Sequence, residues 1–135
     1  MTFIDTGAFY ALADRRDPAH ARARRFFESH RGAFLTTDFI LAETMSLVTK
    51  RLDKRTAVKF GQGVRASSVF RIEEPGPEVK QTAWTLFTSQ LDKDYDLIDC
   101  LSFALMEAFA IREVFGFDRH FAQYGFELLP GRKNR

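Results

Sequence analysis

Short apolar runs alternate with segments of helical periodicity along the chain, and this alternation limits the possible folds more than any other feature. Runs of this kind, bounded by turn residues, predict strands. We expect strands at Thr2–Ile4, Ala33–Thr36, Ser68–Ile72, Val114–Phe117 and Phe126–Leu129. Strands that alternate with helices predict an α/β fold, in which a parallel sheet is flanked by helices on both faces in a three-layer α/β/α arrangement. Such a sheet places its active site at the carboxyl ends of its strands.

Helices are expected between these strands. The clearest helix can be capped by Thr37 or Asp38, because apolar residues then repeat at helical spacing from Leu41 to Leu52. Another begins at Asp17-Pro18, which resembles an N-cap followed by proline at the first helical position. The expected helical segments are 8–12, 18–30, 38–52, 54–66, 78–91 and 97–110, although two glycines interrupt the segment 54–66.

The size and composition of the chain predict one domain. Its 135 residues, of which 45% are hydrophobic, suffice for a continuous core. We expect residues 1–130 to form this domain and residues 131–135 to form a basic, flexible tail. The chain has 20 Lys and Arg residues against 18 Asp and Glu residues, a net charge of +2. This near balance does not by itself indicate a nucleic-acid partner, so the distribution of charge has to decide.

The single cysteine and the absence of long apolar segments indicate the cellular compartment in which the protein is expected. Cys100 lies in an apolar run and has no second cysteine with which to form an internal disulfide. A buried structural thiol in a reducing environment is therefore expected. No segment approaches about 18 uncharged apolar residues, and the N-terminus has no basic region ahead of an apolar run. The sequence therefore predicts a cytoplasmic protein without a membrane segment.

Four acidic residues stand among apolar neighbours: Asp5, Glu43, Asp99 and Asp118. Asp5 and Asp118 end predicted strands, and Glu43 shares a helical stripe with apolar residues, so its side chain is expected to face inward. A buried carboxylate must be neutralised, paired or bound to metal, because an isolated buried charge is very costly. Only Arg119 stands directly beside these acids in the sequence. Hard oxygen ligands without a His or Cys cluster favour one or two Mg²⁺ or Mn²⁺ ions, which activate water for phosphodiester cleavage in many nucleases.

Two of these acids also have interpretations that need no functional site. Asp5 can simply begin a turn, since Asp-Thr-Gly has good turn chemistry. Asp96 and Asp99 are spaced as the two partners of a capping box at the start of a helix. Taken alone, Asp5 is explained equally well by the turn and by a catalytic role, whereas for Asp99 the capping box is the better explanation.

The other two acids have similar alternatives. Glu43 can pair with Lys50 or Arg51 through a tertiary contact, and Asp118 can cap the short turn that follows it. His120, close to Asp118 in the sequence, is expected to be a surface residue rather than a proton shuttle. The joint occurrence of four acids at strand ends and on inward helix faces nevertheless favours one shared site.

Four blocks of sequence carry a family resemblance that covers nearly the whole chain: FIDTGAFYALAD, TTDFILAETMSLV, YDLIDCLSFALMEAFAI and VFGFDRHFAQYGFELLP. With these blocks the chain resembles the PIN-domain ribonucleases, and most closely the VapC-like toxins of bacterial toxin–antitoxin pairs. The resemblance implies a PIN-like fold. It also implies a catalytic, metal-binding quartet with one polar helper, namely Asp5, Glu43, Asp99 and Asp118, with Thr6 beside the first acid.

The same resemblance implies substrate and partners. The substrate would be a structured cellular RNA such as tRNA or rRNA, cut by water attack at a phosphodiester. A small antitoxin would inhibit the enzyme by laying a peptide near the acidic site, with an arginine among the carboxylates. A homodimer is also implied, and exposed parts of the helices around residues 39–66 could supply its apolar contact.

Two positions depart from the family's pattern. Asp96 stands where relatives often have a small hydroxyl residue, and Ile98 stands where threonine is common. Asp96 is either a fifth acid near the metal or only the cap of its helix, and this choice leaves the number of metal ions open. All four quartet positions are filled, so the sequence predicts an active enzyme.

Basic residues close to the acidic segments are candidate RNA contacts: Arg15, Arg16, Arg22, Arg25 and Arg119. Contacts of this kind bind phosphates, so they add salt-dependent affinity without reading the base sequence. For several of these arginines a solvated helix face is an equally good explanation.

Two other classes of protein compete with the nuclease hypothesis. The tripeptide Asp5-Thr6-Gly7 also occurs in dimeric aspartic proteases, but these are built almost entirely from strands, whereas at least four segments here have helical periodicity. The second competitor is a PIN-like module that binds RNA or protein without cutting. Such a module would lack the affinity for divalent metal that the acidic quartet predicts.

Overall fold

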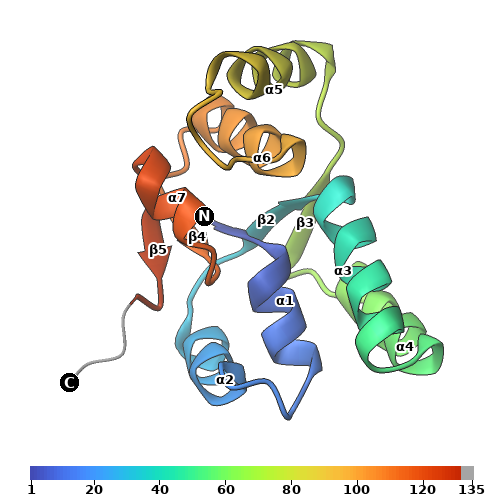
Figure 1. Ribbon diagram of the computed structural model, residues 1–135. Coiled ribbons are helices and arrows are strands. Elements are labelled where there is room, and N and C mark those ends of the chain that lie inside the picture. The colour runs from blue at the N-terminus through green and yellow to red at the C-terminus, as the bar shows by residue number, and fades with distance from the viewer. Residues whose placement is uncertain (132–135) are drawn as a thin grey trace.

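A five-stranded sheet in the order β3-β2-β1-β4-β5 lies at the centre of the computed structural model, which describes residues 1–131 (Figure 1). The strands are β1 (Thr2–Ile4), β2 (Phe34–Thr37), β3 (Phe70–Glu73), β4 (Glu113–Phe115) and β5 (Glu127–Leu129). Every neighbouring pair is parallel, which confirms the expected parallel sheet. β4 ends two residues earlier than predicted, so Phe117 belongs to the loop that follows it.

Within the described residues, seven helices surround this sheet: α1 (Thr6–Ala13), α2 (His20–Ser29), α3 (Asp38–Arg51), α4 (Lys54–Ala66), α5 (Pro77–Ser89), α6 (Leu97–Ala108) and α7 (Arg119–Tyr124). In Figure 1, α6 covers one face of the sheet with α5 packed on it, and α1 and α2 lie on the other face, where α3 packs against α1 and α4 against α3. This is the expected three-layer α/β/α fold. It rules out the aspartic-protease architecture, which consists almost entirely of strands. No helix in this part of the chain combines the length and apolar character that crossing a membrane requires.

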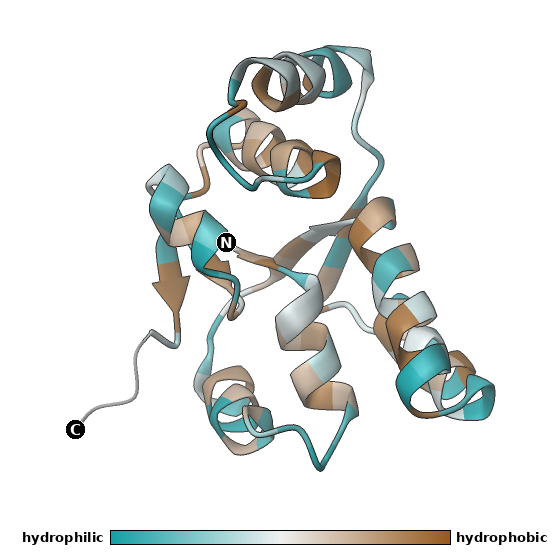
Figure 2. Ribbon diagram, viewed as in Figure 1, coloured by the Kyte–Doolittle hydropathy of each residue, from teal (hydrophilic) through white to brown (hydrophobic). Residues whose placement is uncertain are grey.

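The strands are rich in hydrophobic residues, as the brown segments at the centre of Figure 2 show, and they carry many of the largest buried side chains of the core. Phe3, Phe34 and Phe115 are at most 1% exposed. The ring centroid of Phe34 lies 5.7 Å from those of Phe27 and Phe115 and 5.9 Å from that of Phe70. Because each buried aromatic ring removes a large apolar area from water, core packing accounts for most of the chain's 15 phenylalanines.

Of the helix starts predicted from capping residues, that of α3 is confirmed and that of α2 is wrong. Thr37 caps α3 as expected, because its hydroxyl accepts a hydrogen bond of 3.0 Å from the backbone N–H of Ile40. The helix predicted from residue 18, however, begins only at His20. The Asp17 carboxylate accepts instead from the N–H of Ala19, at 3.0 Å, and so closes a turn ahead of the helix.

Two glycines that interrupted the helical pattern of residues 54–66 do not break α4, and they differ in surroundings. A Cβ atom on Gly61 would lie 2.7 Å from Sδ of Met45 on α3. Gly61 therefore allows α3 and α4 to approach closely. A Cβ atom on Gly63 would meet no atom within 4 Å, so nothing in its surroundings calls for glycine.

These surroundings predict opposite consequences for two alanine substitutions. Gly63→Ala should raise the free energy of unfolding by about 0.5–1 kcal/mol, because alanine favours the helix and meets no neighbour. Gly61→Ala gains the same helix propensity but must displace Met45, so its melting temperature should lie below that of Gly63→Ala. Thermal unfolding followed by circular dichroism measures both. Equal stabilisation by the two substitutions would contradict the close packing of α3 on α4.

Candidate active site

The candidate site lies at the carboxyl ends of β1 and β4, which are neighbours in the sheet. From β1 the chain continues toward one edge of the sheet, through β2 and β3, and from β4 it continues to the other edge, at β5. Such a point is where parallel α/β sheets place their ligands. Asp5 follows β1 directly, and its N–H donates a 3.0 Å hydrogen bond to the carbonyl of Phe115 at the end of β4. An open cleft of about 350 Å³ lies here and is lined by Asp5, Thr6, Gly7, Glu43, Leu47, Asp96, Asp99, Phe117 and Asp118. The fold therefore brings all four predicted acids, and Asp96, into one cleft.

Asp5 is buried at the floor of the site, with 7% of its surface exposed. Burial raises the pKa of this carboxyl to about 8; the N–H of Thr6 partly opposes the rise, and the nearby Asp118, Asp99 and Glu43 add to it. The Asp5 side chain makes no capping hydrogen bond to α1. The interpretation of Asp5 as a mere turn residue therefore does not account for its buried carboxylate.

Gly116 makes room for Asp5, and sequence reasoning did not identify it. A Cβ atom on Gly116 would lie 3.3 Å from the Cβ of Asp5, which is tighter than ordinary contact. The glycine stands directly after β4, so the backbone there passes close beside the acid. A glycine two residues before an acid that follows a predicted strand was the available signal for this close approach.

Asp99 occupies the first turn of α6 and takes part in the predicted capping box. Its N–H donates to Oδ1 of Asp96 at 2.7 Å, and the N–H of Asp96 donates back to Oδ2 of Asp99 at 3.2 Å. The Asp99 residue is nevertheless 8% exposed, and burial, followed by the charge of Asp96, raises the pKa of its carboxyl to about 6. The cap therefore orients Asp99 but does not neutralise it. Asp96 itself is both the cap of α6 and a residue of the cleft wall.

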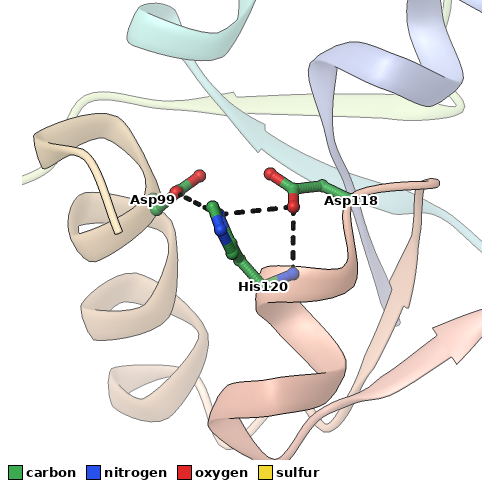
Figure 3. Close-up of side chains that lie close together, drawn as sticks. All are labelled: Asp99, Asp118 and His120. Atoms are coloured by element: carbon green, nitrogen blue, oxygen red, sulfur yellow. Dashed lines mark hydrogen bonds and ion pairs between the residues drawn. The ribbon is translucent and has the colours of Figure 1, made fainter. Parts of the chain in front are cut away.

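Asp118 and His120 meet Asp99 from α7, as Figure 3 shows. Oδ1 of Asp118 accepts a 2.9 Å hydrogen bond from the N–H of His120, which confirms the predicted cap. The Nδ1 atom of His120 lies 3.0 Å from Oδ2 of Asp99 and 3.4 Å from Oδ1 of Asp118. The prediction that His120 is a surface residue was wrong, because the turn capped by Asp118 directs the ring between the two carboxylates. An Asp-x-His spacing after a strand was the signal for this contact.

Glu43 and Thr6 form the third side of the cleft. The Thr6 hydroxyl donates a short hydrogen bond to Oε1 of Glu43, which is half-buried on α3. Glu43 has no ion pair with Lys50 or Arg51 among the contacts of residues 1–131. Thr6 thus lies beside Asp5, as predicted, but its hydroxyl holds Glu43.

The predicted RNA-binding arginines are only partly gathered at this cleft. Arg22 lies over the ring of Phe117, 5.5 Å from its centroid, and also donates to the carbonyl of Gly131. Arg119 lines a polar cleft next to His120. Arg15 lines a different cavity beside α4, whereas Arg16 and Arg25 are exposed near the start of α2 and on it. The rest of the predicted basic tail, residues 132–135, lies outside the described residues.

No lysine or arginine forms an ion pair with the four acids in the described part of the chain. His120 is the only basic side chain recorded in contact with them there. Among residues 1–131, the buried carboxylate of Asp5 therefore has no lysine or arginine partner to offset its charge, and Asp99 has only the imidazole of His120. Their oxygen-rich cleft suits a hard divalent cation.

Known proteins are similar to this chain in both sequence and fold. The profile of the PIN domain matches residues 2–127. The 23S rRNA-specific endonuclease VapC20 of two Mycobacterium tuberculosis strains is 31% identical over 131 residues, which are 96% of this chain and 99% of VapC20.

Two solved structures extend this likeness. The crystal structure of M. tuberculosis VapC20, a sarcin–ricin loop cleaving toxin, superposes with a TM-score of 0.88 at 29% identity, over 93% of this chain and 96% of that one. A chain of a toxin–antitoxin complex from Klebsiella pneumoniae shares the fold with a TM-score of 0.69 at 14% identity, over 99% and 100% of the two chains. The strand-end acids, the parallel α/β fold and these matches lead to one conclusion: the chain belongs to the PIN-domain family and is a homologue of the endonuclease toxin VapC20.

Proposed function

We propose that this protein is a Mg²⁺- or Mn²⁺-dependent endoribonuclease that cuts 23S rRNA in the cytoplasm as the toxin of a toxin–antitoxin pair. Family membership and the 23S rRNA-specific activity of its VapC20 relatives support the nuclease assignment. The observation that carries the metal requirement is a cleft of acids, two of them buried, that receives no lysine or arginine from residues 1–131.

The donor set fits one or two hard divalent ions. Asp5, Glu43, Asp99 and Asp118 supply carboxylate oxygens to the cleft, and Asp96 adds another acid to its wall. The high pKa values of Asp5 and Asp99 mean that their charged forms are unstable without a nearby positive charge. A bound divalent ion would supply this charge, lower the pKa of a water and stabilise the negative charge that develops on the scissile phosphate.

The chain's own contacts hold these groups in place. The Thr6 hydroxyl orients Glu43, the N–H of His120 orients Asp118, and the capping box orients Asp99. Three separate helix starts and one strand end therefore converge on the same cleft. Ligands held by hydrogen bonds lose little freedom on binding, so the site is preorganised for the charge of a phosphodiester.

The arginines near the cleft are proposed to bind RNA phosphates. Arg22 stacks over Phe117, which lines the acidic cleft. Arg119 and Lys93 line a polar cleft of about 360 Å³ that includes His120. Both arginines can thus hold the backbone on either side of the scissile phosphate. Arg15, Arg16 and Arg25 would add weaker, more distant electrostatic attraction.

An antitoxin and a second copy of the chain are the proposed protein partners. A cleft of acids without a lysine or arginine partner in the described residues suits the guanidinium of an inhibitory antitoxin peptide. For the dimer, Trp84 and Phe87 on α5 offer exposed apolar side chains, 52% and 38% exposed, whose ring centroids lie 5.9 Å apart. Leu52 and Val58, in the region 39–66, are exposed as well. This region therefore also offers apolar contacts for the proposed homodimer.

The first prediction tests cleavage. Purified protein incubated with 23S rRNA should cut it in the presence of Mg²⁺ or Mn²⁺ and not in EDTA. Asp5→Asn and Asp118→Asn should each lower the cleavage rate roughly a hundredfold or more, the scale for removing one electrostatic group from a catalytic site. Asp14→Asn, at the other end of α1, is the matched control and should cleave normally.

Mapping of the new RNA ends, with the sarcin–ricin loop as the first region to inspect, completes this experiment. Cleavage that persists in EDTA would contradict the metal requirement. If calorimetry detected no binding of Mg²⁺ or Mn²⁺ that disappears in Asp5→Asn, the non-catalytic PIN-like module would be the better description.

The second prediction concerns stability and pH. Because the pKa of Asp5 rises from 3.8 to about 8 on folding, its contribution to stability is lost as pH rises from 4 to 8. At pH 8, metal-free Asp5→Asn should therefore be more stable than the wild type by roughly 1–3 kcal/mol, the usual cost of an unsatisfied buried polar group. At pH 4 this difference should vanish.

Divalent metal should reverse this order of stability and make the wild type the more stable protein, because only the wild type is stabilised by binding the ion. Thermal unfolding at pH 8 with EDTA and with Mn²⁺ measures both halves of the effect. Asp14→Asn serves again as control, because Tyr10 and the N–H of Arg16 lower the pKa of Asp14, so its neutralisation should not stabilise the protein. A wild type more stable than Asp5→Asn in EDTA at pH 8 would show that the buried charge is compensated without metal.

The third prediction concerns phosphate binding. Arg119→Gln should weaken binding of a 23S rRNA fragment and lower the slope of log affinity against log salt by about 0.7–0.9, the contribution of one phosphate contact. Fluorescence anisotropy in an Asp5→Asn background measures binding without cleavage. Arg24→Gln is the matched control, because Arg24 pairs with Glu28 on the exposed surface of α2. An unchanged salt slope in Arg119→Gln would remove Arg119 from the RNA path.

A further inference from the structure

Among residues 1–131, one group of three potential metal-binding side chains has donor atoms that all lie within 4.8 Å of one another: Asp99, Asp118 and His120. It is the group drawn in Figure 3. The two acids belong to the cleft described above, but the histidine brings a nitrogen donor to a site that otherwise offers oxygen. This nitrogen distinguishes the group from a cluster of carboxylates alone.

The spacing of the three donors resembles that of ligands around one ion. The Nδ1 atom of His120 is 3.0 Å from Oδ2 of Asp99 and 3.4 Å from Oδ1 of Asp118. Neighbouring ligands of an octahedral ion, each about 2.1 Å from it, are separated by roughly 3 Å. The donors therefore need little movement to share one cation.

The ring of His120 is held in this orientation from two sides. The backbone N–H of His120 is tied to Oδ1 of Asp118 at 2.9 Å. The Tyr95 ring packs edge-on against the imidazole, with centroids 5.5 Å apart, and Tyr95 is itself buried. Because the His120 side chain is only 19% exposed, its Nδ1 is directed at the carboxylates by packing as well as by hydrogen bonding.

We propose that His120 is a ligand, through Nδ1, of the same divalent ion as Asp99 and Asp118, and that it makes the site prefer Mn²⁺ over Mg²⁺. The inference rests on the metal site of the proposed function. Its physical basis is that an imidazole nitrogen is a softer donor than a carboxylate or water oxygen, so Mg²⁺, a hard cation held by oxygen ligands, gains less from it than Mn²⁺, which lies in the transition-metal affinity series. A site with four or five acids alone would not discriminate in this way.

A different role for the same contact makes different predictions. If the Nδ1–H of His120 only donates to Asp99, then His120 is a positioning residue that orients a metal ligand without touching the ion. Its loss would weaken Mn²⁺ and Mg²⁺ binding equally. Asparagine, whose amide N–H can replace the donor, would then restore wild-type binding.

Metal titrations of His120→Asn and His120→Ala separate these roles. Calorimetry with Mn²⁺, and with Mg²⁺ in competition, should show that both variants lose Mn²⁺ affinity by at least about tenfold while Mg²⁺ affinity changes less than about threefold. His20→Asn is the matched control: Nδ1 of His20 contacts the carbonyl of Ala11 at 2.7 Å, and this variant should bind both ions normally. Thermal unfolding of each variant verifies that it is folded.

Pulsed electron paramagnetic resonance gives a direct readout. Mn²⁺-loaded wild-type protein should show coupling to a nitrogen that changes when histidine is labelled with ¹⁵N, and this coupling should be absent in His120→Asn and unchanged in His20→Asn. Absence of the coupling in the wild type, an equal loss of both affinities, or full rescue by asparagine would each overturn the inference.

The outcome is separable from that of the proposed function, because neither measurement uses RNA. Nitrogen coupling in a protein that does not cut 23S rRNA would uphold the ligand role of His120 and refute the proposed activity. Metal-dependent cleavage without nitrogen coupling would uphold the activity and refute the ligand role. A wild type that binds neither Mn²⁺ nor Mg²⁺ would refute both.

Discussion

The burial of carboxylates at the carboxyl edge of a parallel sheet is the constraint on which the rest of this structure depends. The sheet places the ends of β1 and β4 side by side, so Asp5 and Asp118 must lie close together whatever the chemistry of the site. Helices α3 and α6 then bring Glu43 and Asp99 to the same cleft. Negative charge of this density raises the free energy of the metal-free fold, and a bound divalent cation would offset it.

Structural and functional roles coincide in these acids. Asp99 is the partner of Asp96 in the capping box of α6, and Asp118 caps α7; the same hydrogen bonds hold both carboxylates at the cleft. A capping interpretation and a site interpretation therefore do not exclude each other. Because a cap fixes the backbone and one carboxylate oxygen, it orients the other oxygen at little additional entropy cost.

Much of the fold follows from the order of local patterns. Apolar runs of strand length, separated by helical periodicity, specify alternating elements, and this alternation leaves a parallel sheet as the main solution. Two local predictions from the sequence were wrong. The Asp17 carboxylate closes a turn instead of capping α2, and β4 ends before Phe117. Helix α4 continues through Gly61, where the absence of a side chain leaves room for Met45 of α3. The periodicity of one helix does not reveal such a contact with another helix.

For the site, the local sequence already marks the unusual acids, because Asp5, Glu43, Asp99 and Asp118 each stand among apolar residues where a charge needs a partner. The identity of those partners depends on the tertiary structure. It brings Thr6 to Glu43, leaves the basic residues of α3 away from it, and turns His120 from an expected surface position to a place between two carboxylates. The reason is physical: hydrophobicity and capping are local properties of the chain, whereas the distance between side chains from different elements depends on how the whole sheet and its helices pack.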